Sequence, residues 1–235
     1  WLSDQNWRQQ PFKYIIREEE DFLLEEMEVR KEKGIGLNTL LKENIFVMFF
    51  SIYSHIPLIV VGKSGCSKSF SIGLIIKNMK GELSNSNFLK KYPVISCTYI
   101  QGSQINTPEY IENAFKEAKN KIYLSQSKKY VSLLIFDNMG LSERSPANYL
   151  KLLYSKLEIS LDEEEKKKIS FIGISNLGLD VVKMSQAIHL SIPDILLDDI
   201  YLIVEAIAKS YDEVLFYKYE KHYISLSMIY FNYKE

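Results

Sequence analysis

Residues 56–69 read IPLIVVGKSGCSKS and combine a short apolar run with a loop rich in glycine, serine and lysine. The apolar run predicts a buried strand, and the apolar residues from Phe70 to Met79 predict a helix after the loop. A glycine-containing loop between a strand and a helix curls its backbone N–H groups around phosphates at the helix N-terminus. This stretch therefore predicts a phosphate-binding loop in an α/β fold.

The loop matches the usual nucleotide-binding pattern except at one position. Its predicted nucleotide-binding residues are Gly62, Lys63, Ser64, Gly65, Cys66, Ser67, Lys68 and Ser69. The usual pattern has glycine where this chain has Ser67, but Gly62 and Gly65 still allow the tight turn. We expect Lys68 to reach the β- and γ-phosphates of ATP and the Ser69 hydroxyl to bind Mg²⁺. The alternative, a polar surface turn, explains this spacing poorly.

Further apolar runs alternate with helical stretches along the chain. The five predicted strands are 56–61, 92–100, 130–136, 169–175 and 187–192. A cap residue followed by proline, at Thr107-Pro108 and at Ser145-Pro146, predicts a helix start. Continuous apolar strands are typical of a parallel sheet that is buried on both faces. We therefore expect a doubly wound, five-stranded parallel sheet with helices on both faces, which binds its ligands at the carboxyl ends of the strands.

Polar residues follow two of these strands. Asp137 ends the third strand, and we expect its carboxylate to hold Mg²⁺. Nucleotide hydrolases commonly have a second carboxylate next, which polarises the attacking water, but this chain has Asn138. An amide cannot accept the proton, and general-base assistance is worth about 10²–10⁴ in rate. Asn176, after the fourth strand, is predicted to contact the γ-phosphate; a simple turn asparagine is the alternative.

The two ends of the chain predict helices outside this core. Residues 1–35 are charged and amphipathic, and we expect a connecting helix rather than a partner-binding element. A helix at 39–54 is apolar enough to be largely buried, and the tail after Pro193 is also helical in pattern. We therefore divide the chain into an N-terminal linker at 1–35, a nucleotide-binding core at 36–193 and a partial helical lid at 194–235.

The composition argues against several other classes of protein. The chain has 235 residues with 29 basic and 30 acidic side chains, so its charge gives no reason to expect nucleic acid or an anionic membrane as the main partner. Two cysteines alone cannot form a zinc site, and no apolar run is long enough to span a membrane. We expect a cytoplasmic location. Because the chain begins with Trp1, we expect it to be a piece of a longer protein.

At four stretches the sequence resembles the mysterin family, giant RING-type ubiquitin ligases with AAA+ ATPase modules. The stretches are 36–69, 106–118, 133–146 and 169–184. The family's own nucleotide loop has serine at the position of Ser67. The resemblance implies an AAA+ fold that binds ATP and Mg²⁺, sister AAA+ modules of the parent chain as partners, and ubiquitin transfer to a protein substrate by another part of that chain. The functional residue types of the family are present at Lys68, Ser69, Asp137 and Asn176.

Two departures from the family pattern bear on function. Asn138 replaces the Walker B glutamate, and residues 185–189 lack the arginine that the family usually has near this position. An arginine finger is worth about 10³–10⁵ in rate. The sequence therefore favours an ATP-binding module with weak or no hydrolysis. The alternatives are an active ATPase motor that remodels a partner, with Glu143 as a substitute carboxylate, and a scaffold that binds no nucleotide.

Overall fold

The computed structural model describes residues 11–124, 130–161, 169–179 and 187–234. The chain forms two compact units. Val47–Asp194 is the core unit, and the residues up to Phe46 together with those from Ile195 form the helical unit. The first ten residues of the predicted linker lie outside the described residues, as do residues 185 and 186 of the arginine-free stretch.

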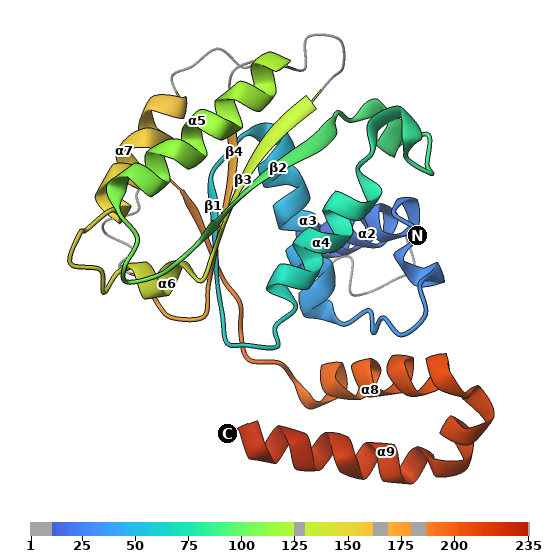
Figure 1. The fold of residues 1–235 in the computed structure, drawn as a ribbon. Coiled ribbons are helices and arrows are strands. Elements are labelled where there is room, and N and C mark those ends of the chain that lie inside the picture. The colour runs from blue at the N-terminus through green and yellow to red at the C-terminus, as the bar shows by residue number, and fades with distance from the viewer. Residues whose placement is uncertain (1–10, 125–129, 162–168, 180–186, 235) are drawn as a thin grey trace. The chain divides into compact units, whose positions relative to one another are not determined.

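The core unit is built on a five-stranded parallel sheet (Figure 1). Its strands are β1 (Leu58–Val61), β2 (Val94–Gln101), β3 (Tyr130–Asp137), β4 (Ile169–Ser175) and β5 (Ile188–Ser191). Their order is β2-β3-β4-β1-β5, and all neighbouring pairs are parallel. The predicted strands are thus confirmed. Because β4 lies between β1 and β3, the carboxyl ends of these three strands are neighbours.

Helices cover both faces of the sheet, as the continuous apolar strands predicted. Helices α5 (Pro108–Leu124) and α7 (Leu150–Leu161) lie on one face, and α4 (Lys68–Asn78) and the core part of α3 (Thr39–Ser54) lie on the other (Figure 1). All side chains of the central strand β4 are buried. Short 3-10 helices are η1 (Val29–Lys31), η2 (Gly81–Leu83) and η3 (Leu89–Lys91). The start of α5 at Pro108 confirms the prediction from Thr107-Pro108.

The other predicted helix start, at Ser145-Pro146, is wrong. A short helix, α6 (Met139–Ser142), comes first, and α7 begins only at Leu150. Between them the Ser145 hydroxyl accepts a hydrogen bond from the Ala147 N–H (3.3 Å), and Asn148 has φ of 48°. The left-handed Asn148 interrupts a continuous helix. The serine and proline therefore form a turn here, which serine and asparagine side chains stabilise as readily as a helix cap.

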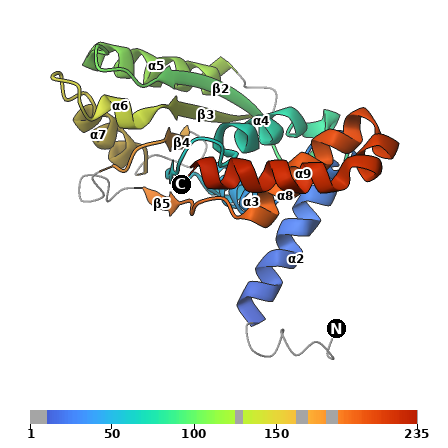
Figure 2. The same cartoon turned by 90° about the horizontal axis from the view of Figure 1, so that it is seen from below.

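The helical unit contains α2 (Pro11–Glu26), the first half of α3, α8 (Leu197–Tyr211) and α9 (Glu213–Lys234). The tail is thus helical, as predicted, and α8 and α9 lie side by side as an antiparallel pair in both views (Figures 1 and 2). The buried carboxylate of Asp199 in α8 accepts a hydrogen bond from the Thr39 N–H (3.1 Å) at the first turn of α3. Among the described residues, no helix is both long and apolar enough to cross a membrane.

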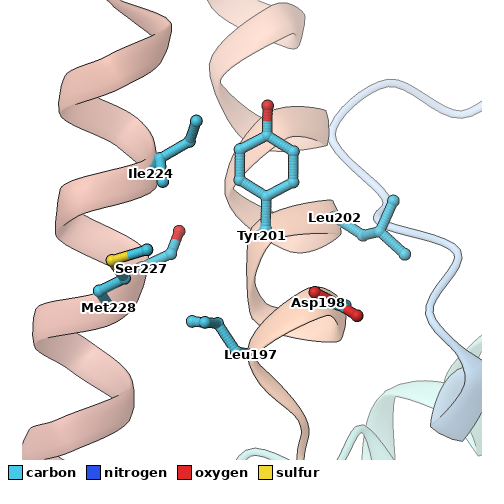
Figure 3. Close-up of a pocket in the computed structure, with 7 residues that line it drawn as sticks. All are labelled: Leu197, Asp198, Tyr201, Leu202, Ile224, Ser227 and Met228. Carbon is cyan, nitrogen blue, oxygen red and sulfur yellow. The ribbon is translucent and has the colours of Figure 1, made fainter.

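An apolar hollow of about 480 Å³ lies between α8 and α9 (Figure 3). It is lined by Leu197, Asp198, Tyr201, Leu202, Ile224, Ser227 and Met228. In Figure 3 the side chains of Leu197 and Tyr201 on α8 face those of Ile224 and Met228 on α9. None of the predicted nucleotide-site residues belongs to this lining.

Candidate nucleotide site

The predicted phosphate loop joins β1 to α4 and has the backbone shape of an anion-binding turn. Gly65 and Ser67 have φ of 88° and 57°, and Ser67 directly precedes α4. Left-handed residues that alternate with ordinary ones turn successive N–H groups to the same side, which forms a concavity for anions. A left-handed residue with a Cβ costs about 1–2 kcal/mol. The loop therefore keeps its shape although serine, not glycine, occupies position 67.

The Lys68 side chain folds over this loop. Its Nζ donates hydrogen bonds to the carbonyl oxygens of Gly62 (2.6 Å) and Lys63 (2.7 Å), and the residue is only 5% exposed. Ser69, the next residue, is exposed. A positive charge, backbone N–H donors and a helix N-terminus thus lie within one short segment. This arrangement fits a phosphate group.

The segment that follows β5 packs against the loop. The Cys66 side chain is 1% exposed, and its Sγ lies 3.9 Å from the Pro193 carbonyl oxygen. The Lys63 ammonium forms an ion pair with Asp194, with Nζ and Oδ2 2.7 Å apart. The hydrogen bond and the charge of Asp194 raise the pKa of Lys63 above its ordinary value. The Cys66 side chain is thus turned away from solvent, and Asp194 lies beside the loop although no local sequence pattern predicts this contact.

Asp137 and Asn138 lie at the carboxyl end of β3. The Asp137 carboxylate accepts a hydrogen bond from the Asn138 N–H (2.8 Å), and Asn138 has φ of 52°. Asparagine tolerates the left-handed region better than longer side chains do. Asn138 is therefore compatible with this backbone conformation. Its side chain also lacks the carboxylate that a general base requires. Gly102, which sequence reasoning missed, follows β2 and donates its N–H to the Asp137 carbonyl oxygen (2.7 Å).

The end of β4 connects the loop with the Asp137 strand. Asn176 is exposed, and the connection is made by the buried Ser175 before it. The Ser175 carbonyl oxygen accepts the N–H of Gly62 (3.1 Å), and its hydroxyl donates to the Leu177 carbonyl oxygen (2.6 Å). A Cβ on Gly140, in α6, would fall 2.6 Å from the Ser175 hydroxyl oxygen. A polar residue at the carboxyl end of a largely apolar strand is the sequence signal for this role.

Tyr149 fixes the loop after β2 to the short helix α6. It is 1% exposed, and its hydroxyl donates to the Ser103 carbonyl oxygen (2.5 Å) and is hydrogen-bonded to the Ser142 hydroxyl. Its ring stacks on Phe136 of β3, with 6.5 Å between the ring centroids. Buried hydroxyl groups need such partners. The segments on both sides of Asp137 are therefore held in place from the α7 side of the sheet.

The protein groups available for Mg²⁺ are the Ser69 hydroxyl and the Asp137 carboxylate. The described residues contain no cluster of three or more His, Cys, Asp and Glu side chains that could hold a metal ion. Mg²⁺ usually keeps several waters and is bound by one or two protein oxygens together with substrate phosphates. Two oxygen ligands at the carboxyl edge of the sheet fit this mode, and the metal role of Ser69 and Asp137 stays a prediction.

Comparison with known families decides what kind of domain this is. The model of the family described as "RNF213 AAA domain" matches residues 34–199. The chain belongs to the RNF213 AAA domain family. The E3 ubiquitin-protein ligase rnf213-beta of Danio rerio is 36% identical over 200 residues, which cover 83% of this chain and 4% of that protein. RNF213 of Homo sapiens is 35% identical over 179 residues, 75% of this chain and 3% of that protein.

These matches confirm the resemblance to the mysterin ligases, and this RNF213 AAA domain spans only 3–4% of the length of those relatives. A solved structure of the Aeropyrum pernix ORC2 protein, in ADPNP–ADP complexes, has a TM-score of 0.50 at 15% identity. The match covers 72% of this chain and 51% of that one. At such low identity the likeness concerns the fold alone. The predicted α/β fold of the P-loop AAA+ type is confirmed.

Proposed function

We propose that this RNF213 AAA domain binds ATP together with Mg²⁺ at residues 62–69 and hydrolyses it weakly or not at all. The observation that carries the proposal is Asn138, which follows Asp137 at the end of β3 and lies in the left-handed region. Its amide can orient a water molecule but cannot take the water's proton. The loop, by contrast, retains the lysine, the hydroxyl and the backbone shape that binding needs.

Each site residue has a separate task in this proposal. The loop N–H groups and Lys68 bind the phosphates, and Asn176 contacts the γ-phosphate. Ser69 and Asp137 hold Mg²⁺, which neutralises phosphate charge when bound. Since β3, β4 and β1 are neighbours in the sheet, their carboxyl ends offer these groups at one edge, where open α/β sheets bind their ligands.

In the parent ligase, ATP would act as a structural or regulatory ligand that orders an array of AAA+ modules. Support comes from the relatives, which are E3 ubiquitin-protein ligases and far longer than this chain. Ubiquitin transfer to a protein substrate then takes place in another part of the parent chain, and sister AAA+ modules are the nearest partners. The cytoplasmic location and the boundaries 1–35, 36–193 and 194–235 stay predictions.

Titration with a fluorescent ATP analogue, with and without Mg²⁺, tests binding. We expect saturable, Mg²⁺-strengthened binding that Lys68→Ala abolishes. Lys77→Ala is the matched control, because Lys77 is an exposed lysine at the other end of α4. If the wild-type protein gives no saturable signal, the domain is a scaffold that binds no nucleotide.

Phosphate release from ATP tests hydrolysis in the same preparation. We expect turnover close to background, because the base is missing at residue 138. Substantial turnover that is lost in both Lys68→Ala and Glu143→Gln would instead identify an active motor unit with Glu143 as the base. Glu143 is exposed and directly follows α6, so this second experiment gives a direct answer.

A further inference from the structure

The nucleotide loop contains a second lysine, Lys63, whose charge is neutralised by a residue from a distant part of the sequence. Its Nζ lies 2.7 Å from the Asp194 carboxylate oxygen, and the two side chains are 61% and 64% exposed. Lys68, in contrast, is buried and donates to backbone carbonyl groups of the loop. The loop thus has one fixed cation, Lys68, and one cation, Lys63, that is paired with an exposed carboxylate.

The position of Asp194 is set by several contacts between its segment and the loop. The Ile192 N–H donates to the Val61 carbonyl oxygen (2.7 Å) just before the loop. A Cβ on Gly62 would fall 2.9 Å from the Ile192 Cβ, so this glycine allows the two segments to touch. Asp194 is also the last residue of the core unit. The carboxylate therefore belongs to the loop's immediate surroundings through the packing of the core unit itself.

Electrostatics makes this ion pair sensitive to phosphate. An exposed pair between a lysine and a single carboxylate is weak. The phosphates of a nucleotide carry several negative charges, and their oxygens bind lysine ammonium groups well. A polyphosphate in the loop therefore competes with Asp194 for Lys63. Because ATP carries one more negative charge than ADP, it competes more strongly.

We propose that Lys63 is a second phosphate-binding cation of this loop and that Asp194 is its competing counter-ion, so that the pair lowers the preference of the loop for ATP over ADP. This inference rests on the proposed function, since it requires that the loop binds a nucleotide. Asp194 is a positioning residue in this scheme: it acts through Lys63 and does not touch the nucleotide. The pair weakens the binding of each nucleotide that uses Lys63, and it weakens the binding of ATP most because ATP makes the stronger contact with this lysine.

A double-mutant cycle measured with Mg²⁺-ATP and Mg²⁺-ADP tests the pair. We expect Lys63→Ala to weaken ATP binding about fivefold, the effect of one exposed charge contact. We expect Asp194→Asn to tighten ATP binding about as much, and ADP binding by a smaller factor, so that the preference for ATP rises. In the Lys63→Ala background, Asp194→Asn should change the ATP dissociation constant by less than about twofold.

The control variant is Glu82→Gln, which makes the same change in net charge at an exposed carboxylate beyond the far end of α4. The inference is overturned if Glu82→Gln tightens ATP binding as much as Asp194→Asn does, because the effect is then one of net charge. It is also overturned if Asp194→Asn acts equally with and without Lys63, or if it weakens binding. Thermal melting of each variant separates these results from loss of folding, and Asp194→Ser serves as a second variant.

The wild-type titration separates this inference from the proposed function. If the wild-type protein does not bind ATP, both fail. If it binds ATP and Lys68→Ala abolishes that binding, while Lys63→Ala changes nothing, the proposed function stands and the role of Lys63 and Asp194 is refuted.

Discussion

The backbone of Gly102 lies so close to Asn138 that a Cβ at residue 102 would fall 2.2 Å from the Asn138 carbonyl oxygen. The Gly102 N–H also donates to the Asp137 carbonyl oxygen (2.7 Å). The loop after β2 therefore determines where the Asp137–Asn138 pair lies. The obstacle is backbone rather than a flexible side chain, so a larger residue at position 102 must displace one of the two segments.

Gly102→Ala is expected to lower the free energy of unfolding by about 3 kcal/mol, because the added methyl group overlaps the Asn138 backbone. Gly73→Ala is the matched control: Gly73 lies in α4 and its Cβ would meet nothing within 4 Å. Alanine there should raise the free energy of unfolding by about 1 kcal/mol. Urea unfolding of both variants measures the difference. Equal urea midpoints for Gly102→Ala and Gly73→Ala would contradict the close contact between the backbones of residues 102 and 138.

Ser67→Gly is expected to raise the free energy of unfolding by about 0.5 kcal/mol. Glycine removes the left-handed strain at φ of 57°, and this gain exceeds the greater backbone entropy of glycine in the unfolded chain. Ser155→Gly, at an exposed position inside α7, should lower the free energy by about 0.5 kcal/mol. Urea unfolding compares the two, and a loss of stability in Ser67→Gly would show that the Ser67 side chain contributes more than its backbone conformation costs.

Asn138→Glu is expected to increase ATP turnover by up to about 10²-fold, because it supplies the missing general base. Asn138→Gln is the control. Glutamine is as long as glutamate and is equally unfavourable in the left-handed region, but its amide cannot act as a base. Steady-state phosphate release measures both. A rise in both variants would mean that side-chain length, and not the carboxylate, limits hydrolysis. No change in Asn138→Glu would leave the missing arginine or a substitute carboxylate as the reason.

Tyr149→Phe is expected to lower the free energy of unfolding by about 1–2 kcal/mol, because it removes a partner from the half-buried Ser103 carbonyl oxygen and from the buried Ser142 hydroxyl. Tyr130→Phe should change it by less than about 0.5 kcal/mol, since Tyr130 is exposed at the start of β3. Phenylalanine keeps the ring stacked on Phe136, so Tyr149→Phe isolates the hydroxyl. A result within error of the Tyr130 control would show that the Tyr149 hydrogen bonds do not stabilise the fold.

The strands and the phosphate loop were predictable because their signals are local. Strand β4 is apolar at nearly every position since helices bury both of its faces, and the loop's glycines and lysine fall at spacings that only a strand–loop–helix unit requires. The helix start predicted at Ser145-Pro146 was wrong, because a serine side chain makes the same kind of hydrogen bond in a turn as at a helix N-terminus. The left-handed conformation of Asn148, which follows this turn, has no sequence signal other than the residue type itself.

The partners of the site residues were not predictable, because they depend on tertiary packing. Asp194 lies 131 residues after Lys63, and its ion pair exists only because β5 pairs with β1. Gly102 is one of 10 glycines in the chain. The residues next to it in the sequence do not indicate that the Asn138 backbone packs against it. Such contacts follow from strand order, which the alternating pattern of strands and helices leaves open.

The buried Ser175 lies where three segments of the site meet. It touches the phosphate loop through Gly62, the short helix after Asp137 through Gly140, and its own turn through Leu177. A bulkier residue at this position pushes on all three segments at once. An attempt to restore hydrolysis in this domain should therefore leave Ser175 unchanged and alter the Asn138 side chain.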